Sequence, residues 1–218
     1  MMRLGDREAG SGSLAKIGID VSRETSARLD AYVAMLREWQ TRINLVSPTT
    51  LGSLWERHIV DSLQLHALKP KALRWADMGS GGGLPGIVLA CALAGQDGAE
   101  IHLIESNYKK AAFLRAVSVA LELPTTIHAM RIEEAVPRLP AIDVLTARAL
   151  APLDDLIAYG NLLLKSGATG LFPKGRDHQS ELTDALRNWQ FSYQLHDSIT
   201  EPASRIIEIT FDPLNQSG

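Results

Sequence analysis

The chain has 218 residues and a formal net charge of −3, and 45% of its residues are hydrophobic and 22% charged. This length suits one domain with a sizeable core, and the composition is that of an ordinary globular protein. No apolar run approaches the roughly 18 residues that cross a bilayer, and residues 1–20 lack the apolar segment of a signal peptide. We therefore expect a cytoplasmic protein that does not associate with a membrane. The single cysteine, Cys91, excludes an intramolecular disulfide and is typical of a reducing compartment.

The N-terminal third of the chain predicts a tail and two helices. Residues 1–20 are rich in glycine and scattered charge, so we expect a flexible tail. Residues 22–40 carry apolar side chains at helical spacing, with Ser22 as a possible cap. After a loop at 44–48, a second amphipathic helix is expected over 51–68. We assign residues 21–70 to a helical cap and 71–218 to a following α/β domain.

The segment 73–93 predicts a strand, a glycine turn and a buried helix. Gly79, Gly81 and Gly83 allow positive φ angles and remove the Cβ atoms that keep a ligand away. The N–H groups of the helix that follows point at whatever lies over the turn, and Pro85 fits the first helical turn. This arrangement favours a nucleotide-like cofactor.

The residues of the turn leave the cofactor open. Gly81 to Gly86 satisfies the G-x-G-x-x-G dinucleotide fingerprint, which alone is a weak signal. The pattern D-x-G-x-G-x-G from Asp77 is instead the S-adenosylmethionine (SAM) signature of class I methyltransferases, and a purely structural turn is a third possibility. The next strand, 101–105, ends at Glu105, a carboxylate placed to accept hydrogen bonds from a ribose diol with either cofactor.

Strands and helices alternate through the rest of the chain. Asn107, with Ser106, is a candidate cap for a helix over 109–117, and further strands are expected at 125–129, 142–147, 168–173, 190–196 and 204–211. Alternation predicts a mostly parallel sheet with helices on both faces. The last two strands lack a long helix between them, which predicts an antiparallel hairpin at the sheet edge.

Several motifs in this order resemble one known family. They are Asn44-Leu45, the RH-x-x-DS pattern from Arg57 to Ser62, the glycine turn 79–86, the segment 109–115, Arg131 to Glu134, the RA-x-x-x-L pattern from Arg148, and Lys174-Gly175. Together they resemble the glucose-inhibited division protein B family, the bacterial 16S ribosomal RNA (guanine-N7) methyltransferases, over about residues 25–212. The resemblance implies a Rossmann-like class I SAM-dependent methyltransferase fold with an N-terminal helical cap, and SAM as the cofactor.

The resemblance also implies a set of site residues. The resemblance implies cofactor contacts at Gly79, Leu84, Ile132, Glu133 and Arg148, and the glycine turn and the strand end add Gly81, Gly83 and Glu105 as expected contacts. Ile132 would pack on the adenine while Glu133 or its neighbouring backbone reads the polar edge of the ring. Arg148 and Lys174 are candidate catalytic residues that position the purine or a phosphate, and His58, one helical turn from Asp61, is a candidate for closing the pocket.

The residues that are present are compatible with methylation of guanine at N7. N7 carries an in-plane lone pair and loses no proton when it attacks, so catalysis needs placement and not a general base. The chain has no [DN]-P-P-[YFW] clamp and no Pro-Cys after the fourth strand, which disfavours methylation of an adenine amine or of cytosine C5. No Cys/His cluster has zinc spacing, so we expect no metal.

The expected partner is 16S ribosomal RNA or the small ribosomal subunit, with the protein acting as a monomer. The net charge argues mildly against RNA binding, but residues 37–74 hold six basic residues against three acidic ones. Two alternatives remain open. One is an NAD(P)-dependent oxidoreductase that uses the same glycine turn, and the other is a ribosome-assembly binding protein without turnover.

Overall fold

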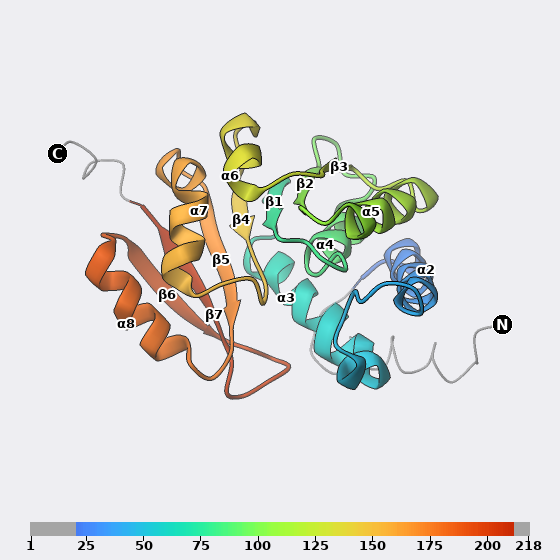
Figure 1. The fold of residues 1–218 in the computed structure, drawn as a ribbon, viewed down its shortest axis with the longest axis horizontal. Helices are drawn as coiled ribbons and strands as arrows, with labels where there is room; N and C mark the ends of the chain where they lie inside the picture. The colour runs from blue at the N-terminus through green and yellow to red at the C-terminus, as the bar shows by residue number, and fades with distance from the viewer. Residues whose placement is uncertain (1–20, 212–218) are drawn as a thin grey trace.

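The computed structural model describes residues 21–211, and the predicted N-terminal tail lies outside them. The described residues form a seven-stranded sheet in the order β3-β2-β1-β4-β5-β7-β6. Its strands are β1 (Arg74–Met78), β2 (Glu100–Ile104), β3 (Thr125–His128), β4 (Val144–Thr146), β5 (Thr169–Lys174), β6 (Ser192–Asp197) and β7 (Arg205–Thr210). The first five strands are parallel, whereas β7 runs antiparallel to both β5 and β6 (Figure 1). The predicted parallel sheet with an antiparallel hairpin at one edge is confirmed.

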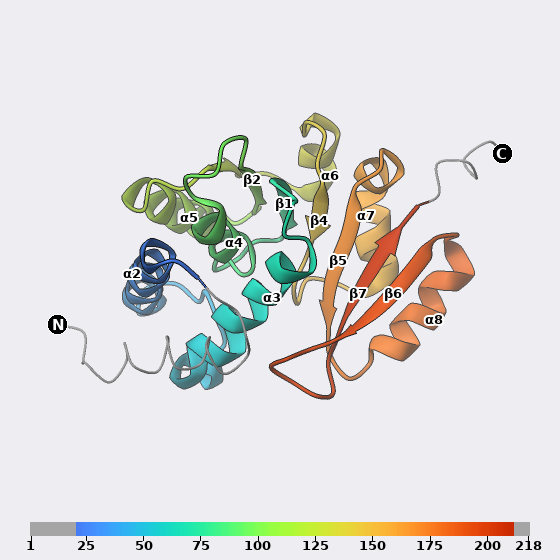
Figure 2. The same cartoon turned by 180° about the vertical axis from the view of Figure 1, so that it is seen from behind.

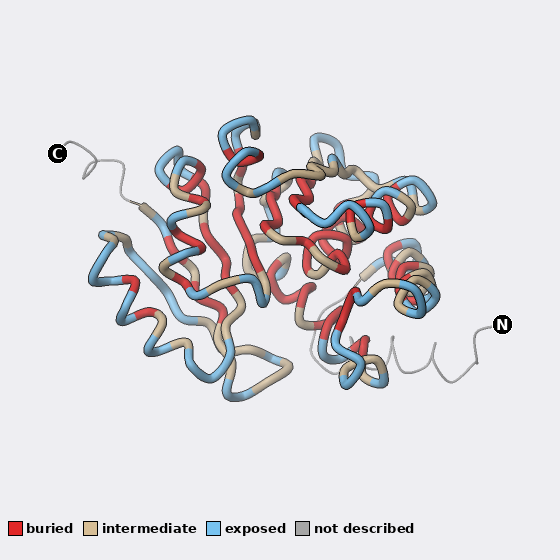
Figure 3. Tube along the Cα trace, in the orientation of Figure 1, coloured by how far each residue is buried: buried red, intermediate tan, exposed pale blue. Residues whose placement is uncertain are grey.

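Helices cover the sheet in two layers, and each layer has its own hydrophobic cluster. The helices α4 (Gly86–Leu93) and α5 (Tyr108–Ala120) lie on one face. The opposite face carries α6 (Ile132–Ala135), the 3₁₀ turn η3 (Val136–Arg138), α7 (Leu153–Lys165) and α8 (His178–Asn188). Residues of a strand alternate between the two clusters, as Trp75 and Ala76 do in β1. Burial is concentrated in the central strands, while the edge strand β6 is mostly exposed (Figure 3).

The N-terminal cap consists of α2 (Arg23–Gln40), the 3₁₀ helix η1 (Pro48–Ser53), the π-helix η2 (Trp55–Val60) and α3 (Asp61–Leu68). The oxygen of Ser22 accepts a hydrogen bond from the Thr25 backbone N–H, so the predicted cap at the start of α2 is confirmed. The single helix predicted over 51–68 is wrong in detail. The helical region starts earlier, at Pro48, whose fixed φ suits a first helical position, and it changes from 3₁₀ to π to α along its length.

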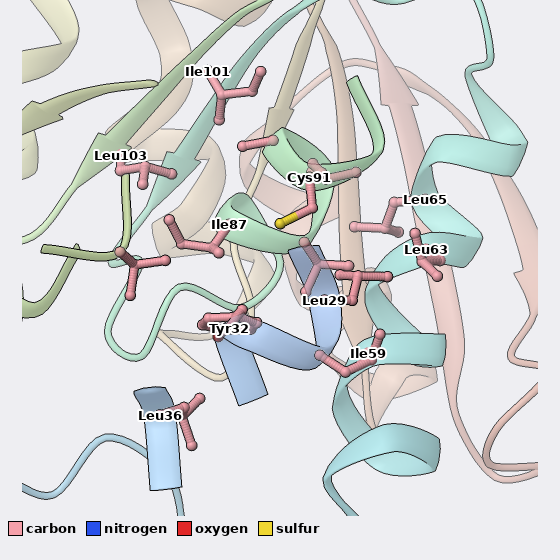
Figure 4. Packing of buried hydrophobic residues seen from close by; sticks show 14 of the residues in the cluster. Leu29, Tyr32, Leu36, Ile59, Leu63, Leu65, Ile87, Cys91, Ile101 and Leu103 are labelled. Atoms are coloured by element: carbon pink, nitrogen blue, oxygen red, sulfur yellow. The ribbon is translucent and has the colours of Figure 1, made fainter. Parts of the chain in front are cut away.

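The cap shares one hydrophobic cluster with α4, α5 and the strands that these helices cover. Leu29 and Leu36 of α2 and Ile59 of η2 pack with Ile87 and Cys91 of α4 (Figure 4). Cys91 is fully buried, and burial raises the pKa of its thiol to about 12, so it behaves as the small core hydrophobe that was predicted. The division between residues 21–70 and 71–218 stays a prediction, since this packing joins the two segments closely.

The strand boundaries differ from the predicted ones by at most two residues, and α5 ends at Ala120, three residues beyond the predicted helix. Helix α4 begins at Gly86, so Pro85 precedes the helix instead of lying in its first turn, and the Leu84–Pro85 peptide bond is cis. Asn107 caps α5 as predicted, because its side-chain oxygen accepts from the N–H groups of Lys109 and Lys110. None of the described helices is long and apolar enough to cross a membrane.

Candidate active site

The glycine turn lies at the carboxyl end of β1, where the strand order of the sheet reverses between β1 and β4 (Figure 2). This switch point is where open α/β sheets bind their ligands. Gly79 and Gly81 adopt φ angles of +70° and +54°, a region that side-chain-bearing residues rarely enter. A Cβ on Gly79 would lie 2.7 Å from Cδ1 of Leu150. Gly79 and Gly81 therefore carry no side chain, and a ligand above the turn can approach the backbone closely.

Glu105 follows β2 directly and turns its carboxylate back toward the glycine turn. Its Oε2 accepts from the Gly81 N–H at 2.8 Å, and its Oε1 accepts from the Asn107 N–H at 2.7 Å. The side chain is buried. Each oxygen keeps a further lone pair, so this carboxylate is fixed in place and still able to accept hydrogen bonds from a ligand.

A cavity of about 330 Å³ opens above these residues. Its floor is formed by Gly79 and Gly81, and Glu105 contributes a carboxylate to its wall. The remaining lining residues are Ile104, Ser106, Lys110, Met130, Arg131, Ile132, Glu133, Ala149, Leu150 and Tyr159. Apolar side chains on one wall suit a flat heterocycle, and a buried carboxylate suits a diol. We refer to this space as the cofactor cavity.

Asp77 lies under the glycine turn, fully buried. Its Oδ2 accepts from the Gly86 N–H at 3.1 Å, while Oδ1 has no hydrogen-bond partner among the described residues. Burial raises the pKa of Asp77 to about 7, and the nearby charge of Glu105 acts in the same direction. Asp77 thus supports the turn from below and does not line either of the two cavities described here.

A second and larger cavity, of about 520 Å³, adjoins the first. The two cavities share Ala149 and Leu150, which follow β4, and Ala149 has a positive φ of 52°. The larger cavity is walled by η2 and α3 on one side and by the β6–β7 loop, residues 198–204, on another. Its charged lining residues are Arg57, Asp61, Arg148, Lys174, Glu181, Glu201 and Arg205. We refer to this space as the substrate-side cavity.

Arg148 crosses from the end of β4 to the cap. Its Nε lies 3.1 Å from Oδ2 of Asp61, and its Nη2 donates to the Arg57 carbonyl oxygen at 2.8 Å. The other oxygen of Asp61 accepts from Thr200 on the β6–β7 loop at 2.8 Å and from Gln64 at 2.7 Å. Asp61 therefore joins three separate chain segments around one guanidinium group.

Lys174, at the end of β5, is held in a similar way. Its Nζ lies 2.7 Å from Oε2 of Glu181 and donates to the Ala151 carbonyl oxygen at 2.6 Å. Oε2 of Glu181 also accepts from the Leu153 N–H at 2.8 Å. The ammonium group is thus fixed beside the loop that follows β4.

Comparison with known proteins identifies the family. Residues 25–207 match the model of the GidB family, described as rRNA small subunit methyltransferase G. The chain belongs to this family. It is 54% identical over 181 residues to the Ribosomal RNA small subunit methyltransferase G of Bradyrhizobium diazoefficiens, which covers 83% of this chain and 70% of that protein.

Two solved structures show the same fold at low sequence identity. A cofactor-bound protein from MTB matches 96% of this chain and 99% of its own, with a TM-score of 0.60 at 13% identity. A variant of MtNAS in complex with S-adenosylmethionine matches 85% of this chain and 75% of its own, with a TM-score of 0.57 at 14% identity. With the sheet order described above, this GidB family member has the class I methyltransferase fold that was expected.

The structure brings together five of the residues that were predicted as cofactor contacts. Gly79, Gly81, Glu105, Ile132 and Glu133 all line the cofactor cavity, because each follows a parallel strand at the same edge of the sheet.

Three other predicted contacts lie outside that lining. A Cβ on Gly83 would meet Ile87 at 2.5 Å, so this glycine serves helix packing, and Leu84 packs against the core. Arg148 lines the substrate-side cavity, together with Lys174.

His58 does not lie where the sequence suggested. The residue is buried within the cap, and its Nε2 lies 2.9 Å from Oγ1 of Thr50. Asp61, one turn along, pairs with Arg148. Burial and the nearby charges of Arg148 and Arg57 lower the pKa of His58 to about 4. Neither cavity includes His58 in its lining.

Sequence reasoning missed residues that belong to the site through distant contacts. Tyr32 of α2 donates to the Gly82 carbonyl oxygen at 2.6 Å and so ties the cap to the glycine turn. Leu150 and Glu181 were not singled out, although the RA-x-x-x-L pattern passed through Leu150. Among the described residues no cluster of three or more His, Cys, Asp or Glu side chains has the arrangement of a metal site.

Proposed function

We propose that this protein transfers the methyl group of SAM to N7 of a guanine in 16S ribosomal RNA of the small ribosomal subunit. The observation that carries the proposal is the meeting of two cavities at Ala149 and Leu150, one suited to a nucleoside and the other lined by four cations and three carboxylates. Membership of the GidB family supports methyl transfer to ribosomal RNA, and disfavours the oxidoreductase alternative.

The cofactor cavity fits SAM by the chemistry of its lining. Glu105 would accept hydrogen bonds from the ribose hydroxyls, Ile132 would pack on the adenine, and Glu133 would read its polar edge. Gly79 and Gly81 leave the turn open to close approach by the ligand. When bound, SAM would supply an electrophilic methyl group.

Catalysis would rest on placement. Guanine N7 presents a lone pair, so no side chain has to remove a proton before attack. The position of His58 agrees with this, because its Nε2 contacts Thr50 and the residue lines neither cavity. Asp61 and the Arg57 carbonyl fix Arg148 through Nε and Nη2, and its remaining donors would meet the guanine O6 or a flanking phosphate. Lys174 is the second fixed cation on this wall.

We further propose that the protein works as a monomer in the cytoplasm. A free, buried Cys91 suits a reducing compartment. Sedimentation of the protein at working concentration tests the monomer, and a dimer with altered activity on dilution would refute it.

The proposal is tested with labelled SAM and small subunits from a strain that lacks the enzyme. We expect label to enter these subunits, at an alkali-labile 7-methylguanine, and not to enter subunits that already carry the methyl group. Hydride transfer with a nicotinamide cofactor would favour the oxidoreductase. Tight subunit binding without any transfer would favour the assembly protein.

Variants of two residues test the mechanism. Arg148→Ala should lower single-turnover transfer by roughly 30-fold to 1000-fold, the usual effect of removing one preorganised electrostatic contact, and Arg148→Lys should restore it only in part. His58→Asn should keep substantial transfer at saturating SAM. A folded, SAM-binding His58→Asn protein without activity, beside a fully active Arg148→Ala protein, would instead indicate a substrate atom that must be deprotonated.

A further inference from the structure

The cations of the substrate-side cavity differ in how firmly they are held. Arg148 and Lys174 are largely buried, and each bonds both a carboxylate and a backbone carbonyl. Moving either one would leave a largely buried carboxylate without its partner, which is strongly unfavourable. Arg205 bonds Asp197 and the carbonyl oxygens of Pro202 and Ser204. These three cations are fixed parts of the wall.

Arg57 is held far more loosely. Its guanidinium contacts Glu201 through one nitrogen, Nη1, at 3.4 Å, and the two side chains are 54% and 43% exposed. Within residues 21–211 the Arg57 side chain makes no other hydrogen bond or ion pair. A single long contact between exposed groups is weak, and most of the donors of the guanidinium fork are unused. Arg57 is therefore the one lining cation of this cavity whose partner can be exchanged at low cost.

The Arg57–Glu201 pair spans the substrate-side cavity from wall to wall. Arg57 lies in η2 of the cap, and Glu201 lies in the β6–β7 loop at the far end of the sheet. The backbone of Arg57 stays anchored when its side chain moves, because its carbonyl oxygen accepts from Arg148. An anion that enters the cavity thus meets an arginine that is positioned by its backbone and blocked by one exposed carboxylate.

An RNA phosphodiester is the anion that this arrangement fits. It offers two oxygens to the guanidinium fork, which gives a stronger contact than the single bond to Glu201. We propose that a backbone phosphate beside the target guanine displaces Glu201 from Arg57, so that the pair is an electrostatic latch that weakens binding of RNA until the phosphate takes its place. This inference rests on the proposed function, since it assumes that RNA enters the substrate-side cavity. Because displacing Glu201 costs free energy, an RNA that contacts Arg57 only through a phosphate would bind weakly, whereas an RNA that also fills the cavity would bind more tightly.

Binding to unmethylated small ribosomal subunits, measured over a range of salt concentrations, tests the latch. Glu201→Gln should bind about threefold more tightly, because the competing charge is gone. Arg57→Gln should bind several-fold more weakly, and the slope of log affinity against log salt should fall by about one, as expected for the loss of one phosphate contact. In the double variant the gain from Glu201→Gln should disappear.

A matched control comes from α8. Asp184 and Arg187 form an exposed pair at 2.8 Å that lines neither cavity, so Asp184→Asn should leave subunit binding unchanged. Calorimetric SAM binding checks that each variant is folded. The latch is overturned if Glu201→Gln binds no tighter, if the gain persists without Arg57, or if the wild-type protein shows no salt-dependent binding to the subunits. Absence of methyl transfer together with the expected binding pattern would refute the proposed function and leave the latch standing.

Discussion

Asp77 gives the most quantitative prediction, because it is a buried carboxyl group with one unpartnered oxygen under the glycine turn. Burial raises its pKa from 3.8 to about 7, while the hydrogen bond from the Gly86 N–H opposes this rise. The substitution Asp77→Asn keeps the shape and an acceptor for Gly86 but removes the titration. The pH dependence of stability should therefore change by an amount that can be worked out.

The sign follows from the direction of the shift. A raised pKa means that the folded protein favours the protonated carboxyl, so this contribution to stability is fully present below pH about 4 and is lost as the pH rises to about 7. A shift of about three units, at about 1.4 kcal/mol per unit, corresponds to about 4 kcal/mol. Relative to wild type, Asp77→Asn should gain up to about that much unfolding free energy between pH 4 and pH 8.

Urea unfolding at a series of pH values, without cofactor, measures this difference directly. The other titrating groups are common to both proteins and cancel. Asp143→Asn is a control of opposite sign, because hydrogen bonds from Arg74 lower the pKa of Asp143, so its effect should be constant between pH 5 and 8. A stability difference for Asp77→Asn that is flat over this range, or that falls as the pH rises, would refute the account of Asp77.

Three further predictions concern the glycine turn and its supports. Gly79→Val should abolish SAM binding in calorimetry with modest loss of stability, because its φ of +70° and the space above it exclude a branched side chain, and unchanged affinity would contradict the role of the turn. Glu105→Ala should weaken SAM binding about tenfold or more by equilibrium dialysis, since charge-assisted bonds are worth about 1.5–3 kcal/mol each, and preferential NADH binding by the wild type would count against it. Tyr32→Phe should cost about 1–3 kcal/mol in thermal unfolding by leaving the Gly82 carbonyl unpaired, whereas Tyr108→Phe, at an exposed position, should cost nothing measurable.

Local signals in the sequence were sufficient for the architecture and for the cofactor cavity. A run of apolar residues ending in glycines, and another ending at Glu105, identify parallel strands whose carboxyl ends meet at one edge of the sheet. Because topology brings these ends together, Gly79, Glu105 and Glu133 could be grouped from the order of the strands, whereas Ile132 was indicated only by the family resemblance. The same topological argument also grouped Arg148, which lines the other cavity. The antiparallel hairpin at the sheet edge was predictable because no long helix separates its two strands.

The substrate-side cavity was decided only by the tertiary structure. Arg57, Arg148 and Glu201 are far apart in the chain, and no periodicity in the sequence states which carboxylate an arginine will meet. His58 and Asp61 lie one helical turn apart in the chain, but only packing of the cap decides that His58 contacts Thr50 and Asp61 pairs with Arg148. Strand ends are placed by hydrogen bonding along a sheet, whereas ion pairs between separate segments depend on how a cap and a loop pack against that sheet.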